Sequence, residues 1–128
     1  MNFNFGSEKL TLKKVMQLAE GTRAGILLSE VITGIQKNNE IVQKIVHSKR
    51  AVYGINTGFG PLCDTLISAK ETSTLQRNLL ITHAVGVGKP IDKKLSKIMM
   101  ICKVHALCRG YSGIRLKVIK RILYCIVN

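Results

Sequence analysis

The chain has 128 residues, of which 46% are apolar and 21% charged. This length and composition fit a single globular domain over 1–128 and exclude a disordered chain. Twenty Lys and Arg residues against seven Asp and Glu residues give a net charge of +13, which favours acidic partners. The most apolar stretches are interrupted by Lys or Arg, so no membrane span of about 20 apolar residues is expected. The four cysteines form no CxxC pair, which argues for a reduced, cytoplasmic setting.

The first forty-six residues predict one strand and three helices. Alternating polar and aromatic residues predict a short strand over 2–5. Apolar residues at helical spacing predict a helix that begins after Thr11 and stops at Gly21. Two further apolar stripes predict two more helices: Ile26, Leu27, Val31 and Ile35 form the first, and Ile41, Val42, Ile45 and Val46 form the second. Asn39 is the expected cap of the latter.

The pattern changes in the middle of the chain, where glycines are frequent. Residues 51–53 are compatible with a brief extended segment, and three glycines within 54–60 predict an ordered loop. Ser73 or Thr74 is the expected cap of the following helix. These features interrupt an otherwise helical pattern.

The last third of the chain predicts two more helices. Asp92 is expected to cap a helix over 93–109, whose apolar residues cover most of its circumference and predict burial on several sides. Ser112 is the expected cap of a final helix that runs to Val127. The predicted fold class is therefore mainly α, with short strands and a glycine-rich loop.

Two groups of residues suggest ligand sites, but in both an ordinary structural role explains the residues better. Residues 86–89 are followed by Pro90, where a phosphate-binding loop needs Ser or Thr. Cys102, His105 and Cys108 would fan over about 120 degrees of a helix, too widely for zinc without a fourth ligand. We therefore expect neither a nucleotide site nor a metal site, and core packing for these cysteines.

The excess of basic residues leaves a binding function open. Nucleic-acid binding usually interleaves aromatic with basic residues, and this chain has three Phe, three Tyr and no Trp. The composition therefore argues against nucleic acid as a partner. A small basic module that binds acidic polymers remains the alternative to an enzyme.

Tyr53 and His83 are candidate catalytic residues, but their residue types and spacing do not distinguish a catalytic from a structural role. An ordinary phenol is protonated at neutral pH, so a tyrosine serves as a base only where a cation or a donor stabilises the phenolate. A tyrosine beside glycines more often packs its ring and bonds its hydroxyl to the backbone. A lone histidine is more often structural.

Three motifs carry a resemblance to a known family: Tyr53-Gly54-Ile55-Asn56-Thr57-Gly58-Phe59-Gly60, then Thr82-His83-Ala84 with Gly86 and Gly88, and then Arg109-Gly110-Tyr111-Ser112-Gly113. In this order and spacing they resemble the amino-terminal part of the histidine ammonia-lyases, within the aromatic amino acid lyases. The similarity covers nearly the whole chain. It implies the amino-terminal portion of the helical ammonia-lyase fold, about the first quarter of a family member.

The resemblance also implies roles for particular residues. Tyr53 would be the catalytic tyrosine that takes the β proton, and the backbone of Gly60 would approach the active centre. Thr82 and His83 would bind the substrate. This pair is similar to the Ser-His of histidine-specific members, which implies conversion of L-histidine to urocanate and ammonia in histidine degradation. An imidazole also suits a hydrogen-bonding partner better than an aliphatic wall.

The chain lacks the tripeptide from which the family makes its cofactor. Family members make an electrophilic methylidene-imidazolone from an internal Ala-Ser-Gly, and no such tripeptide occurs among the 128 residues. They also assemble as homotetramers whose sites combine several subunits. We therefore expect an amino-terminal fragment, truncated before that tripeptide and inactive alone. The alternative within the family is a fragment of a phenylalanine or tyrosine ammonia-lyase.

Overall fold

The computed structural model describes residues 2–128. They divide into two compact units. The first unit combines the chain up to Glu40 with Pro90–Asn128, and the second unit is Ile41–Lys89. The organisation as a single domain remains a prediction. Within the described residues, no helix is long and apolar enough to cross a membrane.

The first unit begins with a two-stranded parallel sheet. Strand β1, Phe3–Asn4, pairs with β2, Gly25–Ile26, in a register that places Phe3 opposite Gly25. The strand predicted over 2–5 is thus confirmed, although it is shorter. The assignment of Ile26 to a helix is wrong, because its carbonyl accepts a hydrogen bond from the backbone N–H of Phe5 at 3.0 Å.

Helix α1, Leu12–Ala19, confirms the short helix predicted after Thr11. The Oγ1 atom of Thr11 accepts a hydrogen bond from the backbone N–H of Lys14 at 3.4 Å, as an N-cap does. Gly21 follows the helix with a φ of +72°, a conformation that favours glycine after a helix end.

Helix α2 is Ser29–Val46, one continuous helix where the sequence predicts two. Asn39 lies inside it rather than at a cap. Its Nδ2 atom donates to the carbonyl oxygen of Gly113 at 2.7 Å. The expected break is wrong because this side chain bonds to a different segment and leaves the helix backbone intact.

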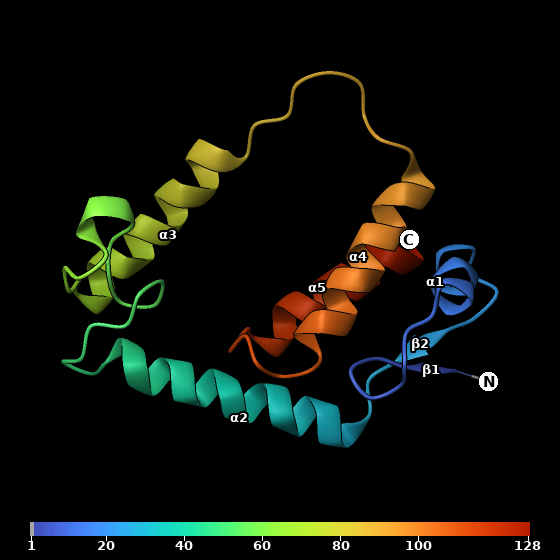
Figure 1. The fold of residues 1–128 in the computed structure, drawn as a ribbon, viewed down its shortest axis with the longest axis horizontal. Coiled ribbons are helices and arrows are strands. Elements are labelled where there is room, and N and C mark those ends of the chain that lie inside the picture. Colours follow the sequence, from blue (N-terminus) through green and yellow to red (C-terminus); the bar gives the residue numbers. More distant parts are fainter. Residues whose placement is uncertain (1) are drawn as a thin grey trace. The chain divides into compact units, whose positions relative to one another are not determined.

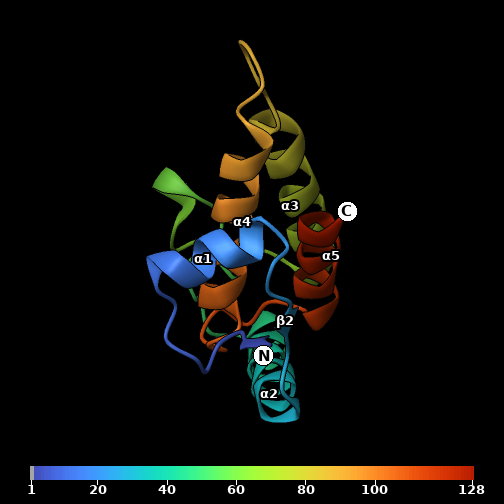
Figure 2. The same ribbon diagram turned by 90° about the vertical axis from the view of Figure 1, so that its right-hand side faces the viewer.

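Helices α4, Lys93–Leu107, and α5, Leu116–Val127, lie side by side, and α1 lies against α4, as Figures 1 and 2 show. Asp92 caps α4 as predicted, because its Oδ1 atom accepts from the backbone N–H of Lys94 at 2.8 Å. The prediction that α4 is buried on several sides is wrong. Its buried residues lie toward one side, and Met99 is 58% exposed.

Helix α5 begins later than the sequence predicts. Arg115 occupies the N-cap position without a capping side chain, so the expected cap at Ser112 is wrong. The positive φ of Gly113, +63°, turns the chain before the helix can start. The apolar stripe of α5 packs into the first unit, where Ile119 and Ile126 are buried.

The hydrophobic core belongs to the first unit. Its buried members are Phe3, Phe5, Val15, Leu18, Ala19, Ile35, Ile101, Val104, Leu107, Cys108, Ile119 and Ile126. Each large apolar side chain buried in this way contributes about 1.5–3 kcal/mol. This unit therefore carries the larger part of the hydrophobic stabilisation among the described residues.

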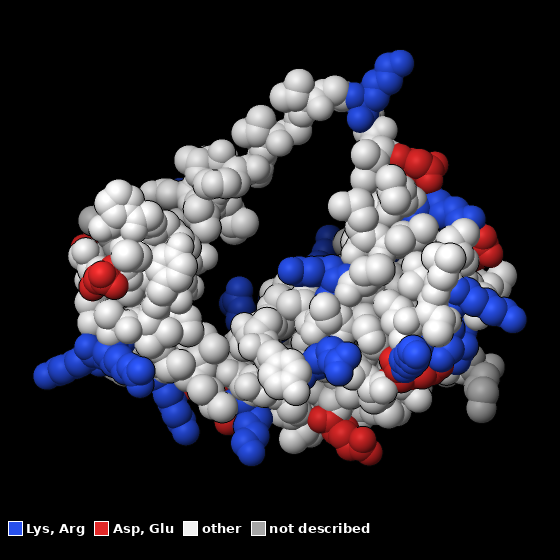
Figure 3. Space-filling view, in the orientation of Figure 1, with Lys and Arg blue, Asp and Glu red and all other residues white. Residues whose placement is uncertain are grey.

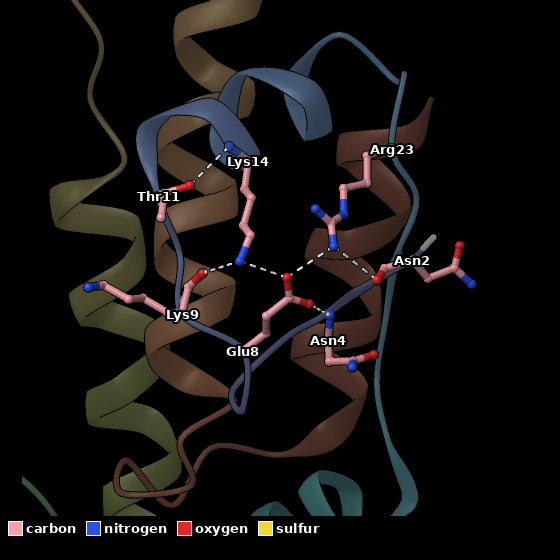
Figure 4. Close-up of polar contacts among 7 residues, drawn as sticks. All are labelled: Asn2, Asn4, Glu8, Lys9, Thr11, Lys14 and Arg23. Carbon is pink, nitrogen blue, oxygen red and sulfur yellow. Dashed lines mark hydrogen bonds and ion pairs between the residues drawn. The ribbon is translucent and has the colours of Figure 1, made fainter.

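An ion-pair cluster holds the amino-terminal segment of the first unit, as Figure 4 shows. The Oε1 atom of Glu8 lies 2.8 Å from Nζ of Lys14 and 3.0 Å from Nη2 of Arg23. Its Oε2 atom accepts from the backbone N–H of Asn4 at 3.0 Å. These contacts, the hydrogen bond from Lys14 foremost, lower the pKa of Glu8.

The second unit contains the short 3₁₀ helix η1, Gly60–Leu62, and helix α3, Ala69–His83. Helix α3 begins earlier than predicted, because Ser68 and Glu71 form a capping box. The expected caps at Ser73 and Thr74 are therefore wrong.

The second unit has little apolar core of its own. Of its described side chains, only those of Asn56 and Thr57 are buried, and both are polar. On α3, Leu80 is 72% exposed and Ile81 is 58% exposed. The apolar surface of this helix is thus uncovered by the described part of the unit.

Candidate active site

Tyr53 occupies a tight turn in the second unit. The backbone N–H of Ile55 donates to the carbonyl oxygen of Val52 at 3.0 Å, and Gly54 has a φ of +76°. A positive φ at the third position is what a type II turn requires, and glycine adopts it without strain. The extended segment expected over 51–53 is therefore wrong, and Tyr53 lies at the second position of the turn.

The side chain of Tyr53 is 64% exposed. Its ring meets the ring of Phe59 edge to face, with centroids 6.2 Å apart. Among the side chains that the structure describes, its hydroxyl has no hydrogen-bond partner. The ring of Tyr53 thus packs against one neighbour, while most of the side chain is accessible from outside the unit.

The glycine-rich loop is ordered by backbone hydrogen bonds, as predicted. Thr57 and Leu66 form an antiparallel bridge, and the N–H of Gly58 donates to the carbonyl oxygen of Thr65 at 3.3 Å. Gly60 begins η1 with a φ of +59°, and a β carbon built there would meet no atom within 4 Å. Its backbone therefore borders open space in the described structure.

Thr82 and His83 are brought together at the carboxyl end of α3. The Nδ1 atom of His83 lies 2.9 Å from the carbonyl oxygen of Leu79 and 3.1 Å from Oγ1 of Thr82. Because a carbonyl oxygen can only accept, Nδ1 carries the proton in this contact. A neutral His83 therefore keeps Nε2 as a hydrogen-bond acceptor.

His83 also lines an open depression of about 420 Å³. The other lining residues are Leu79, Leu80 and Ala84. A polar ring at the edge of an apolar depression can fix the orientation of a small aromatic ligand. Within the described residues, no hydrogen bond or ring contact joins Tyr53 to Thr82 or His83.

The sequence alone assigns no role to Asn56, a buried polar residue in the loop of Tyr53. Asn56 is fully buried, and its side chain makes three hydrogen bonds within the second unit. A polar residue inside a glycine-rich loop is a weak signal on its own, because such residues are common in turns. Only the structure reveals that this side chain bonds to three separate backbone positions.

The cysteines and histidine of α4 have different surroundings. Cys108 is buried, which raises the pKa of its thiol to about 11, whereas Cys102 is exposed. Core packing is thus confirmed for Cys108 and wrong for Cys102. His105 accepts a hydrogen bond from the backbone N–H of Gly6 at 3.2 Å. Among residues 2–128, no cluster of three or more His, Cys, Asp or Glu could hold a metal ion.

Basic residues occur in both units of the chain. On the face that Figure 3 shows, uncharged surface separates most of the Lys and Arg groups. Some of the charge is also neutralised locally, as in the pair between Lys94 and Glu20 at 2.7 Å. Dispersed charge of this kind favours solubility more than a defined track for a polyanion.

Comparison with known proteins relates this geometry to a family. The sequence model of the family described as aromatic amino acid lyase matches residues 10–128. Histidine ammonia-lyase from Vibrio parahaemolyticus is 37% identical over 123 residues, and that from Streptococcus pyogenes is 40% identical over 120 residues. These alignments cover 96% and 94% of this chain but 24% and 23% of the relatives. The chain thus spans about a quarter of their length.

The fold agrees with the sequence match. A crystal structure of histidine ammonia-lyase from Trypanosoma cruzi superposes with a TM-score of 0.84 at 31% identity. It matches 98% of this chain and 25% of that one. The mainly helical fold class with short strands is therefore confirmed. Because the family match extends from residue 10 through the turn of Tyr53 and the end of α3 to residue 128, the chain belongs to the aromatic amino acid lyase family.

Proposed function

We propose that this chain supplies the amino-terminal part of a histidine ammonia-lyase, which converts L-histidine to urocanate and ammonia. In this proposal Tyr53 removes the β proton, and Thr82 and His83 bind the substrate ring. The single observation that carries the proposal is the hydrogen bond between Nδ1 of His83 and the carbonyl oxygen of Leu79, 2.9 Å long. The names of the relatives from Vibrio parahaemolyticus and Streptococcus pyogenes support it.

The state of His83 favours a substrate ring that donates a hydrogen bond. With its proton on Nδ1, a neutral His83 offers Nε2 as an acceptor. The imidazole of histidine has an N–H that can donate to it, and the ring of phenylalanine has no such donor. A site built around an acceptor rejects a ligand that leaves the acceptor unpaired. A tyrosine substrate has a phenol donor, so a lyase acting on tyrosine is the alternative that experiment must separate.

The exposure of Tyr53 fits a residue that meets a substrate. Its accessible hydroxyl can approach a carbon–hydrogen bond of a bound ligand, which a buried phenol could not do. For proton removal the phenol must first become a phenolate, and that requires a cation or hydrogen-bond donors beside it. We expect those groups to come from polypeptide other than residues 1–128. Gly60 belongs to the same loop, and in this proposal its backbone faces the active centre.

The family's methylidene-imidazolone supplies an electrophile that makes the amino group a better leaving group. The residues of this chain do not fit its formation. No Ala-Ser-Gly is present, and Ser112 and Gly113 follow Tyr111 instead of alanine. The electrophile would therefore have to come from other polypeptide. This disagreement is the reason to expect no turnover from residues 1–128 alone.

The proposal also covers the oligomeric state and the cellular location of the enzyme. The exposed apolar residues of α3, among them Leu80 and Ile81, are surface that further polypeptide of a lyase could cover. We propose a homotetrameric, cytoplasmic enzyme of histidine degradation, whose sites combine residues of several subunits. The proposed partners are L-histidine and other copies of the same protein.

A chimaeric enzyme tests the proposal. Residues 1–128 would replace the aligned quarter of histidine ammonia-lyase from Streptococcus pyogenes, and urocanate formation would be followed by its absorbance. We expect turnover of L-histidine by the chimaera and none by the 128-residue chain alone. The same assay with phenylalanine and tyrosine separates the alternatives within the family. Preference for either of these amino acids over histidine would contradict the proposed substrate.

A further inference from the structure

The buried amide of Asn56 connects three backbone positions around the turn of Tyr53. Its Oδ1 atom accepts from the backbone N–H of Val52 at 2.8 Å. Its Nδ2 atom donates to the carbonyl oxygens of Arg50 at 2.9 Å and Ile45 at 3.1 Å. Both donors and the acceptor of the amide are therefore used. Because the N–H of Val52 donates and the carbonyl oxygens of Arg50 and Ile45 accept, only one orientation of the amide satisfies all three partners.

These bonds fix both ends of the segment that carries Tyr53. Val52 immediately precedes Tyr53, and its carbonyl oxygen closes the turn by accepting from Ile55 at 3.0 Å. Ile45 lies in the last turn of α2, and its carbonyl oxygen also accepts from the backbone N–H and from Oγ of Ser48, at 2.9 and 2.8 Å. Asn56 thus attaches the turn to the end of a regular element.

The backbone of Asn56 holds the other side of the loop. Its carbonyl oxygen accepts from the N–H of Ile67 at 2.9 Å, next to the bridge between Thr57 and Leu66. The side chain of Asn56 is fully buried, so water does not compete for its hydrogen bonds. Tyr53 itself is exposed and its only ring partner is Phe59 among the described residues. Its position therefore depends on the backbone of the turn.

We infer that Asn56 is a positioning residue for Tyr53, which holds the turn so that the phenol of Tyr53 reaches the substrate proton. This inference rests on the proposed function. Asn56 touches neither substrate nor cofactor in this account, and it acts through the backbone of Val52. Displacement of a reacting group by about 1 Å can cost roughly 100-fold in rate, so loss of this anchor affects catalysis more than binding.

Two substitutions remove the anchor in different ways. Asn56→Ala leaves the N–H of Val52 without its partner and removes one donor from each of the carbonyl oxygens of Arg50 and Ile45. Asn56→Asp keeps an oxygen for Val52 but places a second oxygen against two carbonyl oxygens, which repel it. The matched control is Asn39→Ala, because Asn39 also donates to a loop carbonyl, that of Gly113, at 2.7 Å. Asn39 has no bond to the turn.

The first measurement uses the 128-residue chain. Amide hydrogen exchange by NMR reports directly on the N–H of Val52. We expect exchange at Val52 to become at least about tenfold faster in Asn56→Ala and to stay unchanged in Asn39→Ala. Equal protection of Val52 in the wild type and Asn56→Ala would overturn the anchor.

The second measurement uses the chimaeric lyase. We expect Asn56→Ala and Asn56→Asp to lower kcat roughly 10- to 100-fold, with KM changed less than about twofold. In the Tyr53→Phe background, Asn56→Ala should lower kcat by less than about twofold further, because two residues that act through one group are not additive. A merely structural role would give the same loss in both backgrounds.

The outcomes separate the inference from the proposed function. A chimaera that keeps its rate with Tyr53→Phe contradicts the proposed function. A loss with Tyr53→Phe but none with either Asn56 variant contradicts the inference alone, as do additive losses. If both Asn56 variants fail to assemble while Asn39→Ala assembles normally, the amide serves folding as a whole and the positioning role is wrong.

Discussion

The backbone N–H of Gly6 donates a hydrogen bond to Nδ1 of His105 at 3.2 Å, joining the amino-terminal segment to helix α4. Because Nδ1 accepts in this bond, the ring of His105 must be deprotonated at that atom. The ring also lies near the aromatic rings of Phe3 and Phe5, with centroids 5.6 and 6.4 Å away. The neutral form of His105 is thus part of the packing of the first unit.

This contact predicts how stability depends on pH. Burial first, and then the positive charge of Arg109, lower the pKa of His105 from 6.5, while Glu8 opposes the shift. Below pH 6.5 the unfolded chain therefore binds more protons than the folded chain. The free energy of unfolding should be highest above this pH and fall as the pH drops toward the lowered pKa. Urea denaturation between pH 5 and 8 measures it.

The control for this prediction is His105→Gln. Glutamine cannot titrate, so the variant should be less dependent on pH in the same interval, even if it is less stable overall. An equal slope in the wild type and His105→Gln would assign the dependence to other groups.

Substitution of Gly6 should destabilise the first unit strongly. Gly6 has a φ of +86°, and a β carbon there would lie 2.5 Å from the carbonyl oxygen of Cys108. We expect Gly6→Ala to lower the free energy of unfolding by about 3 kcal/mol or more, from backbone strain and steric clash together. Thermal or urea denaturation followed by circular dichroism measures the change.

Gly21 offers a matched comparison for Gly6. Its φ of +72° imposes similar backbone strain, but a β carbon there meets nothing within 4 Å. Gly21→Ala should therefore cost only about 1–2 kcal/mol. Similar losses at both positions would show that the close approach to Cys108 adds little.

The sequence predicts elements whose signals are local. The helix start after Thr11 and the cap at Asp92 are both confirmed, because each side chain reaches N–H groups only two or three residues away. The sequence does not predict β2, because a two-residue strand exists only through its pairing with Phe3 and Phe5. The prediction of a cap at Asn39 is wrong because its hydrogen-bond partner also lies far away in the sequence. Its partner, Gly113, is 74 residues away in sequence.

In the candidate site, too, local features are predictable from the sequence and contacts between distant segments are not. The glycine pattern predicts the ordered loop around Tyr53, and the motifs lead to the family. The contact between His83 and Leu79 depends on the helix geometry of residues four apart, so it requires the true bounds of α3. The three bonds of Asn56 could not be predicted, because they depend on how the chain folds back onto the end of α2.

The cysteines should differ in reactivity. Cys108 is buried and the pKa of its thiol is raised to about 11, so little thiolate is accessible at pH 8. Cys102 and Cys125 are exposed. We expect iodoacetamide to label the exposed pair in the native chain and to label Cys108 only after denaturation, as mass spectrometry would show. Labelling of Cys108 as fast as Cys102 in the native chain would contradict its burial.

Substitution of His83 should change substrate preference in the chimaeric lyase. His83→Leu removes the acceptor offered to an imidazole and leaves an aliphatic wall beside Leu79 and Leu80. We expect kcat/KM for histidine to fall by roughly 100-fold or more, and the value for phenylalanine to fall less or rise. Steady-state assays with both amino acids measure this. Parallel losses for the two substrates would remove His83 from substrate selection.

The role of Tyr53 as the base is the central claim, and the turnover number of the chimaera with Tyr53→Phe tests it most directly. Tyr124→Phe is the matched control, because Tyr124 is 57% exposed against 64% for Tyr53 and lies on α5. We predict that Tyr53→Phe lowers kcat for urocanate formation roughly 100- to 10,000-fold while the chimaera stays folded, and that Tyr124→Phe has little effect. An unchanged kcat in a folded Tyr53→Phe chimaera would contradict the account.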